Sequence, residues 1–592
     1  MTGIMDHSAH YEEALPALDA YLSTEEKVIL SDLSVNPSQI QQWAVLKINE
    51  YTNRIRSLKS VYNAGALVNR TLPREVLGEI FANLHHREES RDVELRYLHV
   101  CRLWRHLIFR TPVFWVNMLS RQRSMYARYP NWDPSHLLRL ELYLRLSRAH
   151  SFVLSLHYTH PGLLRTLQPH TTRLSSLTVT AFWQSDMSAL NDVLQCCMPA
   201  LEHLEVTHAS ISGKTIPSLA ITRRTHPRLR SLALPFESLG LACLDDDLQS
   251  LEVSQCRCEP CREVVAKGME LELSKVLGLC PSLHRLKIKN LLHVWGPLDR
   301  TIALPALGEL VIQDQRDDLG TFLACMVYPR SCTVHLSTSA NTTLRACLPP
   351  GSSPCPQLSE TDEVRLSIIF GGWSVVRAFA RGRERLQVGV FAKTSQLAVV
   401  AELTQLFTSS LKITTLTIDP GDYPIIQSSD EPGAVFRAVL AAFPHLEHLD
   451  IGGYYGGRVM PLLSETSTEG LCYCPRLQEL RFVWYHGDDE LYKPSKVPDA
   501  STPESPKGQR YKAGPVIFSV FCDIAARMLH HRKAAGRPLE KLRIGVYPEV
   551  AEESLYVDGE GWEPSVLRRR LRRCLVGYES VVDVFPIKPK AY

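Results

Sequence analysis

The densest group of chemically reactive side chains in this sequence is a cysteine cluster, Cys256-Arg-Cys258-Glu-Pro-Cys261. Zinc binds thiolates at such short spacings, but it needs four ligands within tetrahedral reach. Cys243 and Cys280 are candidate fourth ligands, and a clear second Cys-x-x-Cys or His pair is missing. The sequence therefore favours reduced thiols over a metal centre, and we predict neither a metal ion nor another cofactor.

A second candidate for chemistry is the glycine-rich run from Gly452 to Gly457. A phosphate cradle needs Gly-x-Gly-x-x-Gly order, or a Lys-Ser or Lys-Thr pair after the glycines, and this run has neither. No Gly-x-Ser-x-Gly elbow, His-Glu-x-x-His helix or paired catalytic carboxylate can be placed in the sequence. We therefore predict that the protein is not an enzyme. A thiol-dependent enzyme is the least favoured alternative.

The composition indicates a globular protein of more than one domain. The chain has 592 residues, of which 45% are hydrophobic and 22% are charged, and this length exceeds one ordinary core. Its net charge of +3 is close to neutral, so we expect neither nucleic acid nor a membrane as partner. The sequence does not open with a signal peptide, and the 16 cysteines are scattered. Reduced thiols in the cytoplasm or nucleus are therefore expected.

The N-terminal part of the sequence predicts one long helix. Residues 1–37 are expected to be a disordered lead-in, and residues 38–66 to form an amphipathic helix that is capped by Ser38. From Gln41 to Tyr62, side chains suited to helix packing recur at alternating spacings of three and four, which places them on one stripe. The stripe is only about three heptads long. A short antiparallel or intramolecular helix pairing is therefore favoured over a parallel dimer.

Residues 70–117 predict a small group of apolar helices. Leu72-Pro73 opens the first helix, and its wide apolar face carries Val76, Leu77, Ile80, Phe81 and Leu84. A second helix is expected to run through Leu95, Leu98, Val100, Cys101, Trp104 and Leu107, with Pro112 between it and Phe114-Trp115. So small a unit exposes more apolar surface than it can bury by itself. We therefore expect a second protein to cover part of it.

A recurring Leu-x-x-Leu-x-Leu pattern dominates residues 135–592. Examples are Leu201, Leu204, Val206; Leu229, Leu232, Leu234; and Leu248, Leu251, Val253. The last two positions of each triplet alternate on a short strand, and helix-like stretches lie between the strands. The intervals between triplets are irregular, so the pattern predicts a degenerate leucine-rich-repeat-like domain. Residues 492–515 have almost no apolar side chain and are expected to be a disordered insertion.

Residues Leu72 to Trp115 closely resemble the F-box. The resemblance rests on LPREVLGEIFANL, VCRLWRHLI and TPVFW, in that order. It implies docking on the Skp-type adaptor of a cullin–RING ubiquitin ligase. It places six residues on or near that contact: Leu72, Pro73, Val76, Leu77, Ile80 and Phe81. It assigns six others to the F-box core: Leu84, Val100, Cys101, Trp104, Leu107 and Trp115.

The helix before the box and the loose leucine-rich array after it look like the F-box families of mushroom-forming fungi. Outside the box, the similarity lies in the general arrangement of these segments and not in a shared motif. The expected fold class is α/β, with an N-terminal helix, a small all-α F-box hook and an irregular leucine-rich-repeat-like solenoid. The expected function is a substrate-recognition adaptor, which binds the Skp-type adaptor, and through it a cullin, while the array holds an unknown protein target. The alternative is an interaction scaffold that uses the hook outside ubiquitination.

Overall fold

The computed structural model divides the chain into two compact units. The first comprises Met1–Arg128 and Asp133–Phe152, and the second comprises Tyr129–Trp132 and Val153–Tyr592. Within them the structure describes residues 22–33, 36–84, 93–120, 134–156, 162–181, 184–208, 219–239, 244–255, 273–291, 301–315, 319–339, 342–349, 356–369, 373–391, 396–407, 412–419, 432–452, 456–466, 472–484, 515–546, 569 and 571–586. The predicted insertion at 492–515 therefore lies outside the described residues, except for its last position.

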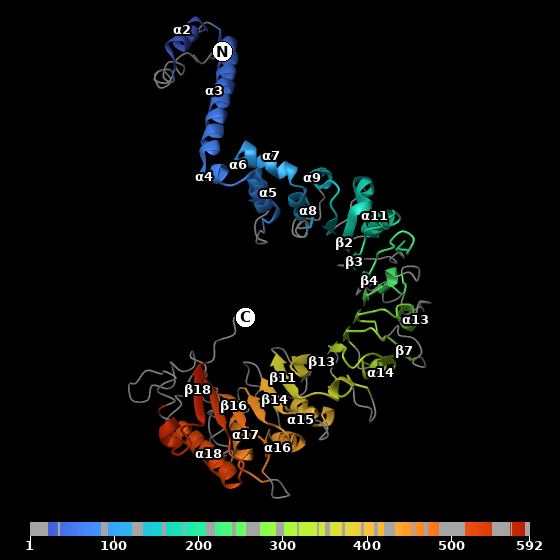
Figure 1. The fold of residues 1–592 in the computed structure, drawn as a ribbon, viewed down its shortest axis with the longest axis vertical. Helices are drawn as coiled ribbons and strands as arrows, with labels where there is room; N and C mark the ends of the chain where they lie inside the picture. The colour runs from blue at the N-terminus through green and yellow to red at the C-terminus, as the bar shows by residue number, and fades with distance from the viewer. Residues whose placement is uncertain are drawn as a thin grey trace, which may run out of the picture. The chain divides into compact units, whose positions relative to one another are not determined.

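The described part of the first unit is helical (Figure 1). Its helices are α2 (Thr24–Leu33), α3 (Pro37–Gly65), α4 (Leu67–Thr71), α5 (Arg74–Ala82), α6 (Val93–Val100), α7 (Arg102–Arg110), α8 (Pro112–Ser120) and α9 (Pro134–Leu146). The range predicted as a lead-in thus contains α2. No helix in the described part of the whole chain is long and apolar enough to cross a membrane.

The N-cap of helix α3 lies two residues earlier than the sequence predicts. Asn36, rather than Ser38, is the N-cap, and its Oδ1 accepts a hydrogen bond from the Ser38 backbone N–H at 3.1 Å. Pro37 follows in the first turn, where the missing N–H of proline costs nothing. None of the described residues of α3 is buried. The apolar stripe of this helix is therefore open to solvent, with Leu58 70% and Tyr62 81% exposed.

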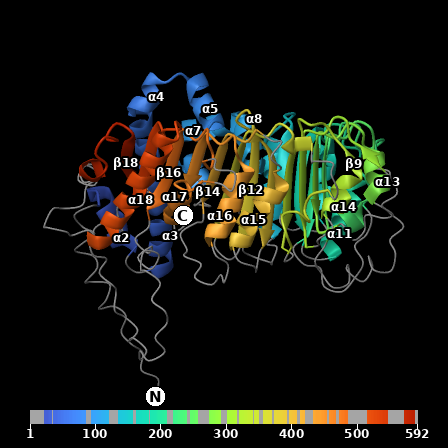
Figure 2. The same ribbon diagram turned by 90° about the horizontal axis from the view of Figure 1, so that it is seen from below.

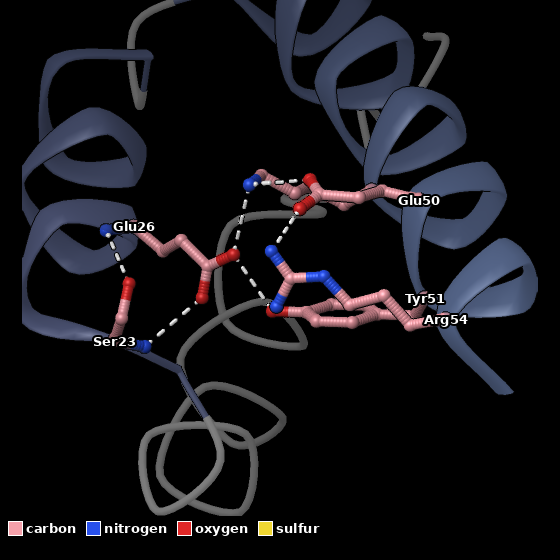
Figure 3. A network of polar contacts seen from close by, with 6 residues as sticks. Ser23, Glu26, Glu50, Tyr51 and Arg54 are labelled. Carbon is pink, nitrogen blue, oxygen red and sulfur yellow. Dashed lines mark hydrogen bonds and ion pairs between the residues drawn. The ribbon is translucent and has the colours of Figure 1, made fainter. Parts of the chain in front are cut away.

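Helix α2 packs on α3 through polar contacts that centre on Glu26 (Figure 3). The Glu26 carboxylate accepts hydrogen bonds from the Tyr51 hydroxyl at 2.7 Å and from the Ser23 backbone N–H at 2.9 Å. It also forms an ion pair of 3.0 Å with Lys47. The Tyr51 hydrogen bond, followed by those from Ser23 and Lys47, lowers the pKa of Glu26 to about 2. The pairing of α3 inside the chain is thus polar, and it leaves the apolar stripe uncovered.

The second unit is built on one 16-stranded sheet (Figures 1 and 2). Its strand order is β1-β2-β3-β4-β5-β6-β8-β10-β13-β12-β11-β14-β15-β16-β17-β18. The first eight of these strands are β1 (Phe152–Leu156), β2 (Leu174–Ala181), β3 (His203–His208), β4 (Ser231–Pro235), β5 (Ser250–Ser254), β6 (Arg285–Lys289), β8 (Glu309–Asp314) and β10 (Thr333–Thr338). The other eight are β11 (Glu363–Ile369), β12 (Trp373–Ala380), β13 (Arg383–Phe391), β14 (Thr415–Asp419), β15 (His448–Ile451), β16 (Glu479–Trp484), β17 (Lys541–Val546) and β18 (Val582–Pro586).

Helices cover one side of this sheet, as Figures 1 and 2 show for α15 to α18. The α-helices of this unit are α10 (Leu163–Leu167), α11 (Gln184–Leu194), α13 (Leu273–Gly278), α14 (Leu319–Ala324), α15 (Gln396–Leu406), α16 (Pro432–Ala442), α17 (Gly456–Leu462) and α18 (Pro515–Ala534). Short 3-10 helices are η2 (Gln168–Arg173), η3 (Phe236–Ser238) and η6 (Pro356–Leu358), and a separate two-stranded sheet pairs β7 (Ile302–Ala303) with β9 (Met326–Val327).

The predicted strands are confirmed, but the predicted fold class is wrong. The triplets lie on strands and bury the expected positions, such as Leu204, Leu232 and Leu251 at 1% exposure or less. The predicted fold class was a small all-α hook followed by an irregular leucine-rich-repeat-like solenoid, and the strands do not form such a solenoid. They join in register into one large mixed α/β sheet. The leucine spacing reports only that each strand buries one face, and it carries no information on how the strands are connected.

The antiparallel part of the sheet shows why a repeat is the wrong description. Strands β11, β12 and β13 form an antiparallel meander with no helix between them. The meander is inserted with β13 beside β10 and β11 beside β14, and both of these pairings are parallel. The sheet therefore stays continuous across a segment that is not a strand–helix unit.

Candidate functional site

Helix α5 carries the residues that the sequence places at the adaptor contact, and the structure divides them between two environments. Leu77 and Phe81 are each 2% exposed and point into the first unit. Val76 is 39% exposed and Ile80 is 42% exposed. Pro73, the N-cap of α5, is exposed as well, whereas Leu72 is half-buried. Spacings of three and four place Pro73, Val76 and Ile80 on one outer stripe of the helix.

The buried side of α5 packs against α7 and α8. The rings of Phe81 and Trp104 meet edge to face, with their centroids 5.2 Å apart. From α8, the Asn117 side chain donates a hydrogen bond of 2.6 Å to the carbonyl oxygen of Ala82, which is the last residue of α5. These contacts fix the helix from its inner side and at its C-terminal end. The outer stripe is thus held in place without being covered in the described part of the first unit.

Asn69 connects three helices, and this role was missed from the sequence. Its side-chain amide nitrogen donates to the carbonyl oxygen of Asn63 at 2.7 Å, and its Oδ1 accepts from the indole N–H of Trp104 at 2.7 Å. It thereby ties α3, α4 and α7 together. Asn69 lies inside the short helix α4. Trp104 is half-buried, and a tryptophan that is partly removed from water needs a partner for its N–H, which was the available signal.

The predicted second helix is in fact two helices separated at Cys101. This residue has extended backbone, with φ −157°, and its Sγ accepts a hydrogen bond from the Trp104 backbone N–H, with 3.4 Å between Sγ and N. It is therefore the N-cap of α7. Of the other predicted core residues, Val100 is 44% exposed, while Leu84, Trp104 and Leu107 are half-buried. Only Trp115 of that set is fully buried, at 1% exposure.

Trp115 connects the F-box-like helices to α9. Its indole N–H donates to the carbonyl oxygen of Ile108 at 2.9 Å. Its ring lies against Phe109, Phe114 and Tyr143, with centroid distances of 5.6, 5.1 and 5.3 Å. Tyr143 belongs to α9, so the compact unit extends beyond residue 117, where the predicted F-box ends.

The candidate metal ligands Cys256, Cys258, Cys261 and Cys243 lie outside the described residues, and the fifth candidate, Cys280, is buried. Among the residues that the structure does describe, no group of three or more His, Cys, Asp or Glu side chains could hold a metal ion. The glycine-rich run is described only at Gly452 and from Gly456, where α17 begins.

Comparisons with known proteins do not assign a family. No protein-family model matches the chain, and no curated protein matches it. The resemblance of Leu72 to Trp115 to the F-box therefore rests on the sequence of these residues alone.

Proposed function

We propose that the protein is an F-box-type adaptor, in which α5 docks on the Skp-type adaptor of a cullin–RING ubiquitin ligase and the sheet unit holds a protein target. The chain would perform no chemistry. Its contribution would be to raise the effective concentration of the target near the catalytic subunits.

The observation that carries this proposal is the apolar outer stripe of α5. Val76 and Ile80 remain about two-fifths exposed, at 39% and 42%, although their neighbours Leu77 and Phe81 are fully packed. A protein gains by covering such side chains, at about 25 cal/mol per Å² of apolar surface removed from water. The framework behind the stripe is rigid, because aromatic rings and side-chain hydrogen bonds hold it. These are the properties of a preorganised docking helix.

The test is binding of purified Skp-type adaptor to the full chain by calorimetry. The double variant Val76→Asp/Ile80→Asp places charges on the outer stripe, and we expect it to weaken binding at least about tenfold. Circular dichroism and the Tm should be unchanged, because neither side chain packs in the core. Leu58→Asp is the matched control, since Leu58 is 70% exposed on α3, and we expect it to bind as the parent chain does. Equal binding by the double variant and the control would refute the proposal.

A second candidate function is an interaction scaffold that uses the same stripe outside ubiquitination. The exposed stripe itself favours neither. Co-purification of a cullin with the full chain supports the ubiquitin-ligase function. Co-purification of the Skp-type protein without a cullin favours the scaffold.

A further inference from the structure

The open face of the sheet, opposite the leucines of the core, carries a hollow of about 260 Å³ between β2 and β6. Strands β4 and β5 present short side chains there, namely Ser231, Ala233 and Ser250. The flanking strands present longer ones, with Glu205 on β3 and Lys287 on β6. The hollow therefore results from small residues in the middle of the row. Its volume is below the about 300–1,000 Å³ of pockets for drug-sized ligands, which suits one side chain rather than a cofactor.

The strand register places two carboxylates on either side of the floor. Glu205 is paired with Ala233, and Ala233 is paired with Glu252 on the next strand. Neighbouring strands are about 4.8 Å apart, so the backbones that carry Glu205 and Glu252 are about 10 Å apart, with only a methyl group between them. A group that enters above Ala233 lies between Glu205 and Glu252, and Glu252 is already paired with Lys287 and Lys289.

The cations that line the hollow already have partners. Lys287 lies 3.2 Å from Glu252, which also pairs with Lys289 at 2.7 Å. On the same strand, Arg285 pairs with Glu309 at 3.1 Å. Glu205 differs, because among the described residues its carboxylate has only the Thr178 hydroxyl as a partner, at 3.4 Å. Glu205 is therefore the acidic side chain of the hollow that lacks a counter-ion among the described residues, whereas Glu252 is shared by two lysines.

We propose that this hollow binds the arginine or lysine side chain of a basic segment in a target protein. The cationic group would lie above Ala233 and pair with Glu205, and the hydroxyl groups of Ser231 and Ser250 would accept its remaining hydrogen bonds. Partly buried charge-assisted hydrogen bonds of this kind are stronger than neutral ones. The inference rests on the proposed function in one respect, since it names the chemistry of the target that the sheet unit would hold.

The probe is a random library of displayed peptides that is selected on the full chain. We expect the enriched peptides to share an arginine or a lysine. Replacing that arginine by citrulline, or that lysine by glutamine, removes the charge and should weaken binding of the synthetic peptide about tenfold or more. Glu205→Gln should cause a similar loss, and Ala233→Trp, which fills the hollow from its floor, should abolish binding.

Glu540→Gln is the matched control, because Glu540 is exposed in the same unit and does not line the hollow. It should bind the enriched peptides as the parent chain does. The binding result for Ala233→Trp is interpreted only if circular dichroism shows that this variant is folded. If it is not folded, Glu205→Gln provides the test. No enrichment, enrichment of acidic or neutral peptides, or equal binding by Glu205→Gln and Glu540→Gln would overturn the inference. Binding of the Skp-type adaptor, measured on the same variants, reports separately on the proposed function.

Discussion

Adjacent side chains on α5 differ in burial, so substitutions at them can separate an effect on stability from an effect on adaptor binding. Leu77 is packed inside the first unit, so truncation to alanine removes core contacts and costs about 2–5 kcal/mol. Val76, its neighbour, is 39% exposed, so its replacement leaves the framework in place. A loss of adaptor binding is therefore informative for Val76 and Ile80, and uninformative for Leu77 and Phe81.

At the same scale, the Glu26 carboxylate predicts a pH dependence of the contact between α2 and α3. Its pKa is lowered from the ordinary 4.5 to about 2. A lowered pKa means that the ionised form stabilises the contact. This stabilisation is fully present above pH 4.5 and is lost as the pH falls from 4.5 through 2. We expect amide protection in α2, corrected for the intrinsic exchange rate, to fall over that interval.

Two variants control the measurement on Glu26. Glu26→Gln removes the charge that Lys47 pairs with, so α2 should be weakly protected at every pH and show no transition. Glu25→Gln changes an exposed neighbour in the same turn and should leave the transition in place. A transition that persists in Glu26→Gln would mean that another group controls the contact.

At the scale of elements, the sequence predicts local structure well where one face must be buried. The triplets identify the strands, because alternation of buried leucines is a property of a single strand. The sequence does not show that Cys101 ends one helix and caps the next, since Val100 to Trp104 continue the apolar helical pattern. Nor does it show the sheet, because the pairing of β13 with β10 depends on backbone hydrogen bonds between residues far apart in the chain.

The same limit applies to the candidate site. The F-box-like motif locates the proposed docking helix, but six apolar residues look alike in a sequence, and only the packing of α7 and α8 decides which of them face outward. The hollow on the open face leaves no motif, because it arises from short side chains on β4 and β5 that become neighbours only through the register of the sheet.

Arg532 shows how one element positions another, and it supplies a prediction about stability. It lies on α18 with 0% exposure and donates to the carbonyl oxygens of Tyr473, Cys474 and Leu477 at 3.0, 3.1 and 3.2 Å. These carbonyls belong to the turn that enters β16, where Cys474 has a φ of +46°, a conformation that side chains disfavour. Arg532→Met removes the guanidinium donors of all three carbonyls, and among the described residues only the Cys474 oxygen keeps another donor, the Leu477 backbone N–H at 3.0 Å. We expect a loss of roughly 2–5 kcal/mol.

Urea unfolding followed by circular dichroism measures this loss. Arg527→Met is the matched control, because Arg527 is exposed on the same helix, and we expect it to change the free energy of unfolding by less than about 0.5 kcal/mol. If the two variants are equally stable, the turn before β16 does not depend on the guanidinium of Arg532.

At the scale of the whole molecule, the two binding surfaces that we propose lie on different compact units of one chain. The outer stripe of α5 belongs to the first unit, and the hollow above Ala233 belongs to the second. An adaptor that works by proximity needs both surfaces to be occupied at the same time. A chain that binds only the target, or only the ligase, does not bring the two together. In the proposed mechanism, the two surfaces therefore act in series.

This serial arrangement gives the last prediction, on the turnover of a reporter protein in cells. The reporter carries a basic peptide enriched on the full chain, and its half-life is followed after synthesis is stopped. Val76→Asp/Ile80→Asp and Glu205→Gln should each lengthen the half-life of the reporter. With Val76→Asp/Ile80→Asp, the half-life should equal that in cells that lack the chain. The variant that combines both changes should have the same half-life as Val76→Asp/Ile80→Asp, because a chain that no longer binds the ligase cannot bring a bound target to it. Glu540→Gln and Leu58→Asp should behave as the parent chain. A combined variant with a longer half-life than Val76→Asp/Ile80→Asp would mean that the two surfaces act independently, and proximity through one chain would then not be the mechanism.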